Sequence, residues 1–243
     1  MNKTFILSSF AIAGVLTSMY ILGDAIKNRN QADETITVTG LGTKKFTSDL
    51  ISWSGNFTKS NYDLKSAYKE LLSDKEEIHK YLLSKGIKSD EIIFSAVDIS
   101  KNYNYNTDTN GNSYAVFSGY LLTQSISIES KEVEKIENIS RNITEIINLG
   151  VEFTSSPPQY FYTKLSDVKH EMIATATQDA KERAEKIASN AGAKLGKLKK
   201  ANMGVIQITA PNSNEDFHYG GAFNTSSKEK EASITMKLEY KIR

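Results

Sequence analysis

The fold is decided by Ile234-Thr235-Met236-Lys237-Leu238-Glu239-Tyr240-Lys241-Ile242, a stretch near the end of the 243-residue chain. Apolar residues alternate with polar or charged ones, and this period of two predicts a strand with one buried face and one face in water. Strands of this kind are typical of antiparallel sheets. We therefore expect an antiparallel sheet that includes the C-terminal strand.

Working outward from this strand, the sequence alternates between short strand patterns and longer helical patterns. Apolar residues at helical spacing predict three long helices, at about 61–84, 131–148 and 165–191, and Gly86, Gly150 and Gly192 are expected to end them. Strands are expected at about 35–58 (two strands), 91–105, 114–128, 151–163, 198–209 and 234–242. The order ββαββαβαββ, with many hairpin-like neighbours, predicts an α+β fold with antiparallel sheets.

The third predicted helix carries a stripe of small residues. Its inward positions are expected to be Ala176, Ala180, Ala184, Ala188 and Ala191, together with Ile173 and Ile187. Small side chains at this spacing let a helix lie close to a sheet or to another helix.

The N-terminal segment predicts export. Residues 5–22 form a mostly apolar, uncharged run preceded only by Lys3, which is short for a membrane span and long for a signal-peptide core. No small-x-small cleavage site closes the run. We interpret residues 1–23 as a signal-anchor, with a cleaved signal peptide as the alternative and a buried core helix as the less favoured one. Residues 24–34 are polar and predict a tether, followed by one domain at 35–243, with 35–129 and 130–243 as its two candidate halves.

Composition excludes several classes of function. Thirty basic and 29 acidic residues give a net charge of +1, so no global field would recruit nucleic acid. Cysteine is absent, which removes disulfides, thiolate metal sites and cysteine nucleophiles. The sequence contains no Walker loop, no dinucleotide fingerprint and no paired-histidine metal motif. We expect no cofactor, no metal and no nucleic-acid partner.

A catalytic site is equally hard to find. His79 and His170 lie on predicted helices, and Ser66-Ala67-Tyr68-Lys69 fits an S-x-x-K pattern without its partner motifs. Residues 211–228 are rich in Asn, Ser and Gly and predict a mobile loop. Within it, Asp216, His218 and Tyr219 form the only candidate site that we single out. We expect no enzyme.

The hairpin predicted around Asn110-Gly111 is unusually aromatic. Its aromatic residues are Tyr103, Tyr105, Tyr114, Phe117 and Tyr120. Two interpretations stay open: these side chains form an exposed face for a partner, or they pack as ordinary strand residues.

The ordered set of patterns resembles the SIMPL-domain family of exported bacterial proteins. The resemblance lies in Ile36-Thr37-Val38-Thr39-Gly40-Leu41-Gly42, in Asp49-Leu50-Ile51-Ser52-Trp53, in Leu82 to Ile87 followed by Ile92-Ile93-Phe94, and in the alanine rhythm from Ala174 to Gly196. It implies an α+β domain in the periplasm or anchored in a membrane, with loose links to stress responses and the cell envelope. It also implies self-association into ring-like or channel-like oligomers in some members, and it brings no catalytic residues.

We therefore predict a non-enzymatic, membrane-tethered cell-envelope protein that acts by self-assembly or by binding a protein partner whose identity stays open. The alternative hypothesis is a periplasmic small-molecule binder or hydrolase. Its site would lie near the 211–228 loop, at Asp216, His218 and Tyr219.

Overall fold

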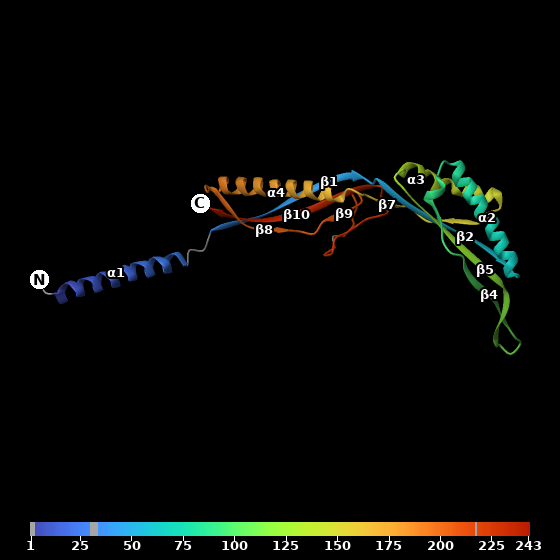
Figure 1. The fold of residues 1–243 in the computed structure, drawn as a ribbon, viewed down its shortest axis with the longest axis horizontal. Helices are drawn as coiled ribbons and strands as arrows, with labels where there is room; N and C mark the ends of the chain where they lie inside the picture. The colour runs from blue at the N-terminus through green and yellow to red at the C-terminus, as the bar shows by residue number, and fades with distance from the viewer. Residues whose placement is uncertain (1–2, 30–33, 217) are drawn as a thin grey trace. The chain divides into compact units, whose positions relative to one another are not determined.

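The computed structural model describes residues 3–29, 34–216 and 218–243 (Figure 1). Parts of the predicted anchor (residues 1–2) and tether (residues 30–33) lie outside the described residues. The side chains of residues 3–11 and 26–29 are likewise outside the description.

The fold is α+β, as the sequence predicts, with helices and strands in nearly the predicted order. The elements are α1 (Lys3–Arg29), β1 (Thr35–Thr47), β2 (Leu50–Asn61), α2 (Leu64–Ser84), a 3₁₀ turn η1 (Ser89–Glu91), β3 (Ile92–Phe94), β4 (Asp98–Thr107), β5 (Ser113–Ser130), α3 (Val133–Asn142), a 3₁₀ helix η2 (Ile143–Leu149), β6 (Phe153–Ser155), β7 (Gln159–Phe161), α4 (Leu165–Asn190), β8 (Leu195–Met203), β9 (Gln207–Thr209) and β10 (Glu229–Ile242).

The chain divides into two compact units, each built from separate segments. One comprises Met1–Gly40, Thr177–Met203 and Met236–Arg243, and the other comprises Leu41–Ala176 and Gly204–Thr235. The units therefore interleave along the chain, whereas the halves 35–129 and 130–243 would each be continuous.

The larger unit contains a six-stranded antiparallel sheet in the order β3-β5-β2-β6, with β4 also on β5 and β7 also on β2. The longest ladder in it joins β2 to β5 without a register shift, from Ile51 opposite Ser130 to Asn61 opposite Tyr120. One face of this ladder is apolar and packs against α2 and α3. The core residues on it are Ile51, Trp53, Phe57, Leu122, Ile126 and Ile128, all at most 1 % exposed.

Helix α2 begins three residues after the predicted start at 61 and ends before Gly86, as predicted. The Asp63 carboxylate caps it by accepting a 2.8 Å hydrogen bond from the backbone N–H of Ser66, and Gly86 follows its end with φ +82°. Its buried stripe is Ala67, Leu71, Asp74, Ile78 and Leu82. Leu64, Tyr68 and Leu72 of the same helix are exposed.

Four predicted elements are interrupted or shorter than expected. The helix expected over 131–148 is α-helical only to Asn142 and continues as η2, because Ile143 and Ile146 are both buried and a spacing of three residues matches the 3₁₀ period. The strand expected at 151–163 is split into β6 and β7 around Pro157-Pro158, since proline has no N–H for the ladder. The expected strands at 91–105 and 198–209 are likewise split, each into two.

The small-residue stripe of α4 is confirmed and follows a strict spacing of four. Its buried members are Val168, Met172, Ala176, Ala180, Ala184 and Ala188. Ile187, expected inward, is 52 % exposed, and Ala191 lies beyond the helix end. The C-terminal strand is confirmed as β10, in which Ile234, Met236, Leu238 and Tyr240 are buried. In the smaller unit it pairs antiparallel with β8, from Met236–Met203 to Ile242–Leu195.

Among the residues whose side chains the structure describes, no helix is both long and apolar enough to cross a membrane, so a transmembrane helix is not found in this part of the chain. The apolar run at 5–22 includes residues 5–11, whose side chains lie outside the description. The signal-anchor therefore stays a prediction.

A mostly buried ion pair connects α2 to the sheet. Lys59 Nζ on β2 lies 3.0 Å from Asp74 Oδ2, and the two side chains are 23 % and 10 % exposed. Burial raises the pKa of the Asp74 carboxyl, against the opposing effect of Lys59. The free-energy cost of removing the carboxylate from water therefore exceeds the stabilisation that Lys59 provides.

This pair predicts an asymmetric response to mutation. Lys59→Met is expected to lower the free energy of unfolding by about 3–5 kcal/mol, because it leaves the carboxylate of Asp74 buried without its cation. The double variant Lys59→Met/Asp74→Leu is expected to return to the stability of the wild type or exceed it. Urea unfolding measures both, with the exposed Lys69→Met on α2 as the control. A double variant as unstable as the single one would refute this explanation.

Candidate functional site

The loop that carries the predicted site is held in place by one buried side chain. Gln207 on β9 is 8 % exposed, and its Nε2 donates to the carbonyl of His218 at 2.9 Å. Its Oε1 accepts from the backbone N–H of His218 at 3.2 Å and of Ala222 at 2.7 Å. A single carboxamide thus bonds the loop three times, which fixes the position of the His218 backbone.

A second buried group holds the end of the loop. Lys230 is 1 % exposed, and its Nζ donates to the carbonyl oxygens of Asn224 and Ser227. Burial lowers the pKa of this ammonium. The expected mobile loop is therefore fastened at two points through buried polar side chains.

The predicted site residues are only partly brought together. A cleft of about 560 Å³ is lined by Leu41, Val205, Gln207, His218, Tyr219, Ser233, Ile234 and Thr235. His218 and Tyr219 thus share a cleft, whereas Asp216 is not part of its lining and the neighbouring Phe217 lies outside the described residues. Among the described residues, no hydrogen bond joins the His218 ring to another side chain. The lining combines apolar side chains with the polar Gln207, Ser233 and Thr235, so the cleft suits a small ligand of mixed polarity.

The other histidines do not add to this cleft. His79 Nε2 lies 3.1 Å from Ser89 Oγ, and the ring is near Phe94. His170 lies in the first half of α4. In the described part of the chain, no group of three or more His, Asp or Glu side chains is arranged to hold a metal ion.

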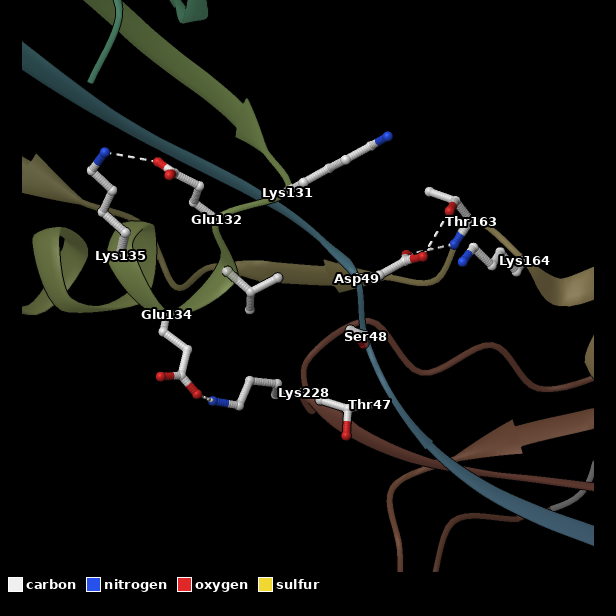
Figure 2. Close-up of a pocket in the computed structure, with 11 residues that line it drawn as sticks. Thr47, Ser48, Asp49, Lys131, Glu132, Glu134, Lys135, Thr163, Lys164 and Lys228 are labelled. Carbon is white, nitrogen blue, oxygen red and sulfur yellow. Dashed lines mark hydrogen bonds and ion pairs between the residues drawn. The ribbon is translucent and has the colours of Figure 1, made fainter. Parts of the chain in front are cut away.

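A second cleft, which the sequence analysis missed, lies where the chain enters α3 (Figure 2). We call it the α3 cleft; its volume is about 640 Å³ and its lining is Thr47, Ser48, Asp49, Lys131, Glu132, Val133, Glu134, Lys135, Thr163, Lys164 and Lys228. Four separate segments contribute to it, so no local sequence motif predicts it. The nearest signal is the run Lys131-Glu132-Val133-Glu134-Lys135, which is ordinary for the start of a helix.

Much of the charge in the α3 cleft is compensated. Lys135 Nζ lies 2.7 Å from Glu132 Oε2, and this contact holds the pKa of Glu132 below its ordinary value. Lys228 Nζ lies 3.2 Å from Glu137 and 3.4 Å from Glu134, and the hydrogen bond to Glu137 raises its pKa. Asp49 accepts two 2.7 Å hydrogen bonds from Thr163, one from the backbone and one from the hydroxyl.

A third feature is the aromatic hairpin of β4 and β5. The turn is as predicted, with Asp108 Oδ1 accepting from the backbone N–H groups of Asn110 at 2.9 Å and Asn112 at 2.8 Å. Phe117 forms edge-to-face contacts with three tyrosines. The centroid distances are 5.2 Å to Tyr62, 6.0 Å to Tyr103 and 5.2 Å to Tyr120.

The aromatic residues of the hairpin differ in burial. Phe117 and Tyr120 are partly buried, so the inner part of the cluster packs as an extension of the core. Tyr103, Tyr114 and Tyr105 are 46 %, 52 % and 74 % exposed. The outer part of the hairpin therefore presents aromatic side chains to solvent.

Comparison with known protein families tests the family resemblance that the sequence patterns indicate. The model of the SIMPL family, described as a protein of unknown function (DUF541), matches residues 36–240. The chain belongs to the SIMPL family. The match runs from Ile36 in β1 to Tyr240 in β10; it covers the whole of the larger unit and leaves out residues 1–35 and 241–243 of the smaller one. No curated protein matches this SIMPL chain.

The role of Gln207 predicts local loosening when it is removed. Gln207→Ala is expected to destabilise the 212–222 loop by about 1–3 kcal/mol, because buried backbone groups lose their partners. Amide exchange or limited proteolysis within the loop should then accelerate about fivefold to a hundredfold, since 1.4 kcal/mol is a factor of ten. The matched control is Gln178→Ala, at an exposed position on α4. Unchanged loop exchange in Gln207→Ala would contradict this role.

Proposed function

We propose that this SIMPL protein is a non-enzymatic, membrane-tethered protein of the cell envelope, and that it acts by self-association through its aromatic hairpin. We call Asn102–Gly119 the β4–β5 ribbon. The observation that carries the proposal is that this ribbon leaves the sheet as two unsupported strands. The ladder of β2 with β5 ends at Asn61–Tyr120, while β4 and β5 continue pairing to Thr107–Ser113 (Figure 1).

A ribbon of two strands is a weak structure when left in water. Two-stranded hairpins are marginally stable alone, and three or more strands or a packed face are needed for independent stability. The inner aromatic cluster supplies part of that support. The outer part, with Tyr105 and Tyr114, has both faces exposed and would be stabilised by a partner.

The ribbon also lacks the usual protection of a sheet edge. Proteins block exposed edges with lysine, proline or inward-pointing charges. Between Asn102 and Thr107 the sequence has neither charge nor proline, and the one charge in the whole ribbon is Asp108 in the turn. By contrast, the edge strand β8 carries Lys197, Lys199 and Lys200. An open edge of this kind favours pairing with another strand.

The partner that fits this edge best is a second copy of the chain. The uncharged β4 edge from Asn102 to Thr107 offers no complementary field to a charged partner, whereas it suffers no charge repulsion from a second copy. Two β4 edges brought together antiparallel about a twofold axis form a closed, isologous contact. The net charge of +1 leaves the whole chain with little self-repulsion.

The proposed attachment to the membrane is supported by the side chains of α1. The apolar residues described in it are Ile12, Val15, Leu16, Met19, Tyr20, Ile21 and Leu22, each 57–78 % exposed. At 3.6 residues per turn, all of them except Ile21 fall on one side of the helix. An exposed apolar surface of this kind normally lies against protein or lipid, which favours a membrane location for α1. Retention of the full chain in the membrane fraction after an alkaline wash tests this part of the proposal.

The ribbon is tested by placing charge on its edge. The full chain in a mild detergent is expected to form a defined multimer by light scattering after size exclusion. Asn104→Lys/Asn106→Lys is expected to reduce it to a monomer, because lysines on an edge strand disfavour strand pairing. Since α1 is intact in the variant, a change in mass would come from the ribbon and not from the detergent-bound segment.

The matched control is Asn202→Lys, which adds a lysine to the exposed edge strand β8. It should keep the mass of the wild type. A wild-type chain that is monomeric at about 100 μM, roughly the upper range for weak functional contacts, would refute self-association. A charged ribbon that leaves the multimer intact would show that assembly uses another surface.

A periplasmic small-molecule binder or hydrolase is the second candidate, favoured by the cleft at His218 and Tyr219. Its volume of about 560 Å³ falls within the range of ligand sites. A library screened by thermal shift should then yield ligands whose effect is lost in Tyr219→Ala. Tyr114→Ala, at an exposed tyrosine outside the cleft, is the control. Equal loss in both variants, or no ligand for the wild type, would remove this candidate.

A further inference from the structure

We propose that the α3 cleft is a binding site for a phosphate group, carried by inorganic phosphate, a small phosphomonoester or a lipid headgroup. This inference concerns a different surface from the β4–β5 ribbon and stands or falls independently of self-association. It rests on three properties of the cleft: two lysines that form no ion pair with another described residue, the N-terminus of α3, and a buried hydroxyl without a partner.

The first property is the charge that remains after pairing. Lys135 and Lys228 are compensated by Glu132, Glu134 and Glu137. Lys131 and Lys164, in contrast, have no carboxylate within 4.0 Å among the described residues. The remaining acid, Asp49, accepts two hydrogen bonds from the neutral Thr163 and keeps its negative charge (Figure 2). The lining therefore holds four lysines and three carboxylates, a net charge of +1, and the ammonium groups of Lys131 and Lys164 form no ion pair within the described part of the chain.

The second property is the start of α3. This helix has ten residues, and its N-cap residue, Glu132, makes no side-chain capping hydrogen bond. The first backbone N–H groups of a helix have no partner within the helix, and its N-terminus carries partial positive charge. Such an end binds phosphate or other anions readily. Here it opens into a cleft that already holds the two lysines.

The third property is Ser48. This residue lines the cleft and is only 5 % exposed, yet its Oγ has no hydrogen-bond partner among the described residues. Its backbone N–H donates to the carbonyl of Lys228 at 3.0 Å, so the residue is fixed in place. Figure 2 draws Ser48 between Lys228 and Asp49, within the ring of lining residues. Buried hydroxyls normally have partners, and one without a partner at a cleft indicates a missing acceptor.

Together these groups match a doubly charged oxyanion better than other ligands. A phosphate offers several acceptor oxygens, enough for two ammonium groups, a helix N-terminus and a hydroxyl at once. A single carboxylate has only two oxygens and one charge. A long polyanion such as nucleic acid would meet the carboxylates of Glu132 and Glu134 at the same cleft.

The binding test uses the full chain in detergent and isothermal titration with inorganic phosphate and with glycerol 3-phosphate at low salt. Lys131→Gln/Lys164→Gln is expected to weaken binding about tenfold or more, since each charge-assisted hydrogen bond contributes to affinity. Ser48→Ala should weaken binding severalfold while leaving thermal stability unchanged. A merely structural serine would lower the stability and not the affinity.

The matched control is Lys186→Gln/Lys197→Gln, which removes the same charge from exposed positions outside the cleft. It should bind phosphate as the wild type does. Equal weakening in both double variants would overturn the proposal, because it would reduce the effect to general electrostatics. A wild type that binds neither probe at about 10 mM, the weak limit of measurable affinity, and binds none of the vesicles would also overturn the proposal.

Vesicles distinguish the sources of the phosphate. The full chain without detergent is mixed with phosphatidylcholine vesicles, with and without phosphatidic acid. Phosphate-dependent heat without a preference for phosphatidic acid supports a soluble ligand. A preference for phosphatidic acid that is lost in Lys131→Gln/Lys164→Gln but kept in the control supports a headgroup. A preference kept in both variants would overturn headgroup binding at this cleft.

Discussion

The ladder between β2 and β5 is the constraint on which the rest of the structure depends. It aligns Ile51, Trp53 and Phe57 with Leu122, Ile126 and Ile128 on one face, and α2 and α3 are stabilised by covering that face. A slip of one residue would turn all of these side chains to the opposite face. The same ladder determines where β5 loses β2 as a neighbour, because β2 stops at Asn61 while β5 begins seven residues before Tyr120, at Ser113. The β4–β5 ribbon is a direct consequence of that mismatch in length.

The transition from sheet to ribbon has a specific backbone basis. The β4–β5 register shifts between Asn102 and Tyr103, so that Asn102 is opposite Gly119 and Tyr103 is opposite Phe117. Gly119 has φ +132°, and a Cβ there would lie 2.8 Å from the carbonyl oxygen of Asn61, so only glycine fits. Because the bulge inserts one residue, Phe117 contacts Tyr120 and continues the core face outward. Packing is thus carried past the end of β2 and stops before Tyr105.

Much of this fold could be predicted from periodicity, because burial of one face controls most of its elements. The alternation in 234–242, the helical stripe of α2 and the alanine spacing of α4 each involve residues close in sequence. The predictions were wrong where tertiary packing overrode the local pattern, as in η2. They were also wrong where a predicted strand is interrupted, as between β3 and β4. The α3 cleft could not be predicted at all, since Ser48, Lys131, Lys164 and Lys228 meet only after folding. The loop site was half predicted: His218 and Tyr219 share a cleft, while Asp216 is not part of its lining, and the loop is held by hydrogen bonds to Gln207 that the sequence does not reveal.

The most direct test of the central claim is the distance between ribbons of two copies. The sequence contains no cysteine, so Asn106→Cys gives a single spin-label site in β4. Double electron–electron resonance on the full chain should then give one narrow inter-copy distance. That distance should lie below about 25 Å, because paired strands are separated by about 4.8 Å and rise about 3.3 Å per residue. It should disappear when labelled chains are diluted with unlabelled ones. A multimer in which this label gives no inter-copy distance in that range would contradict assembly through the ribbon.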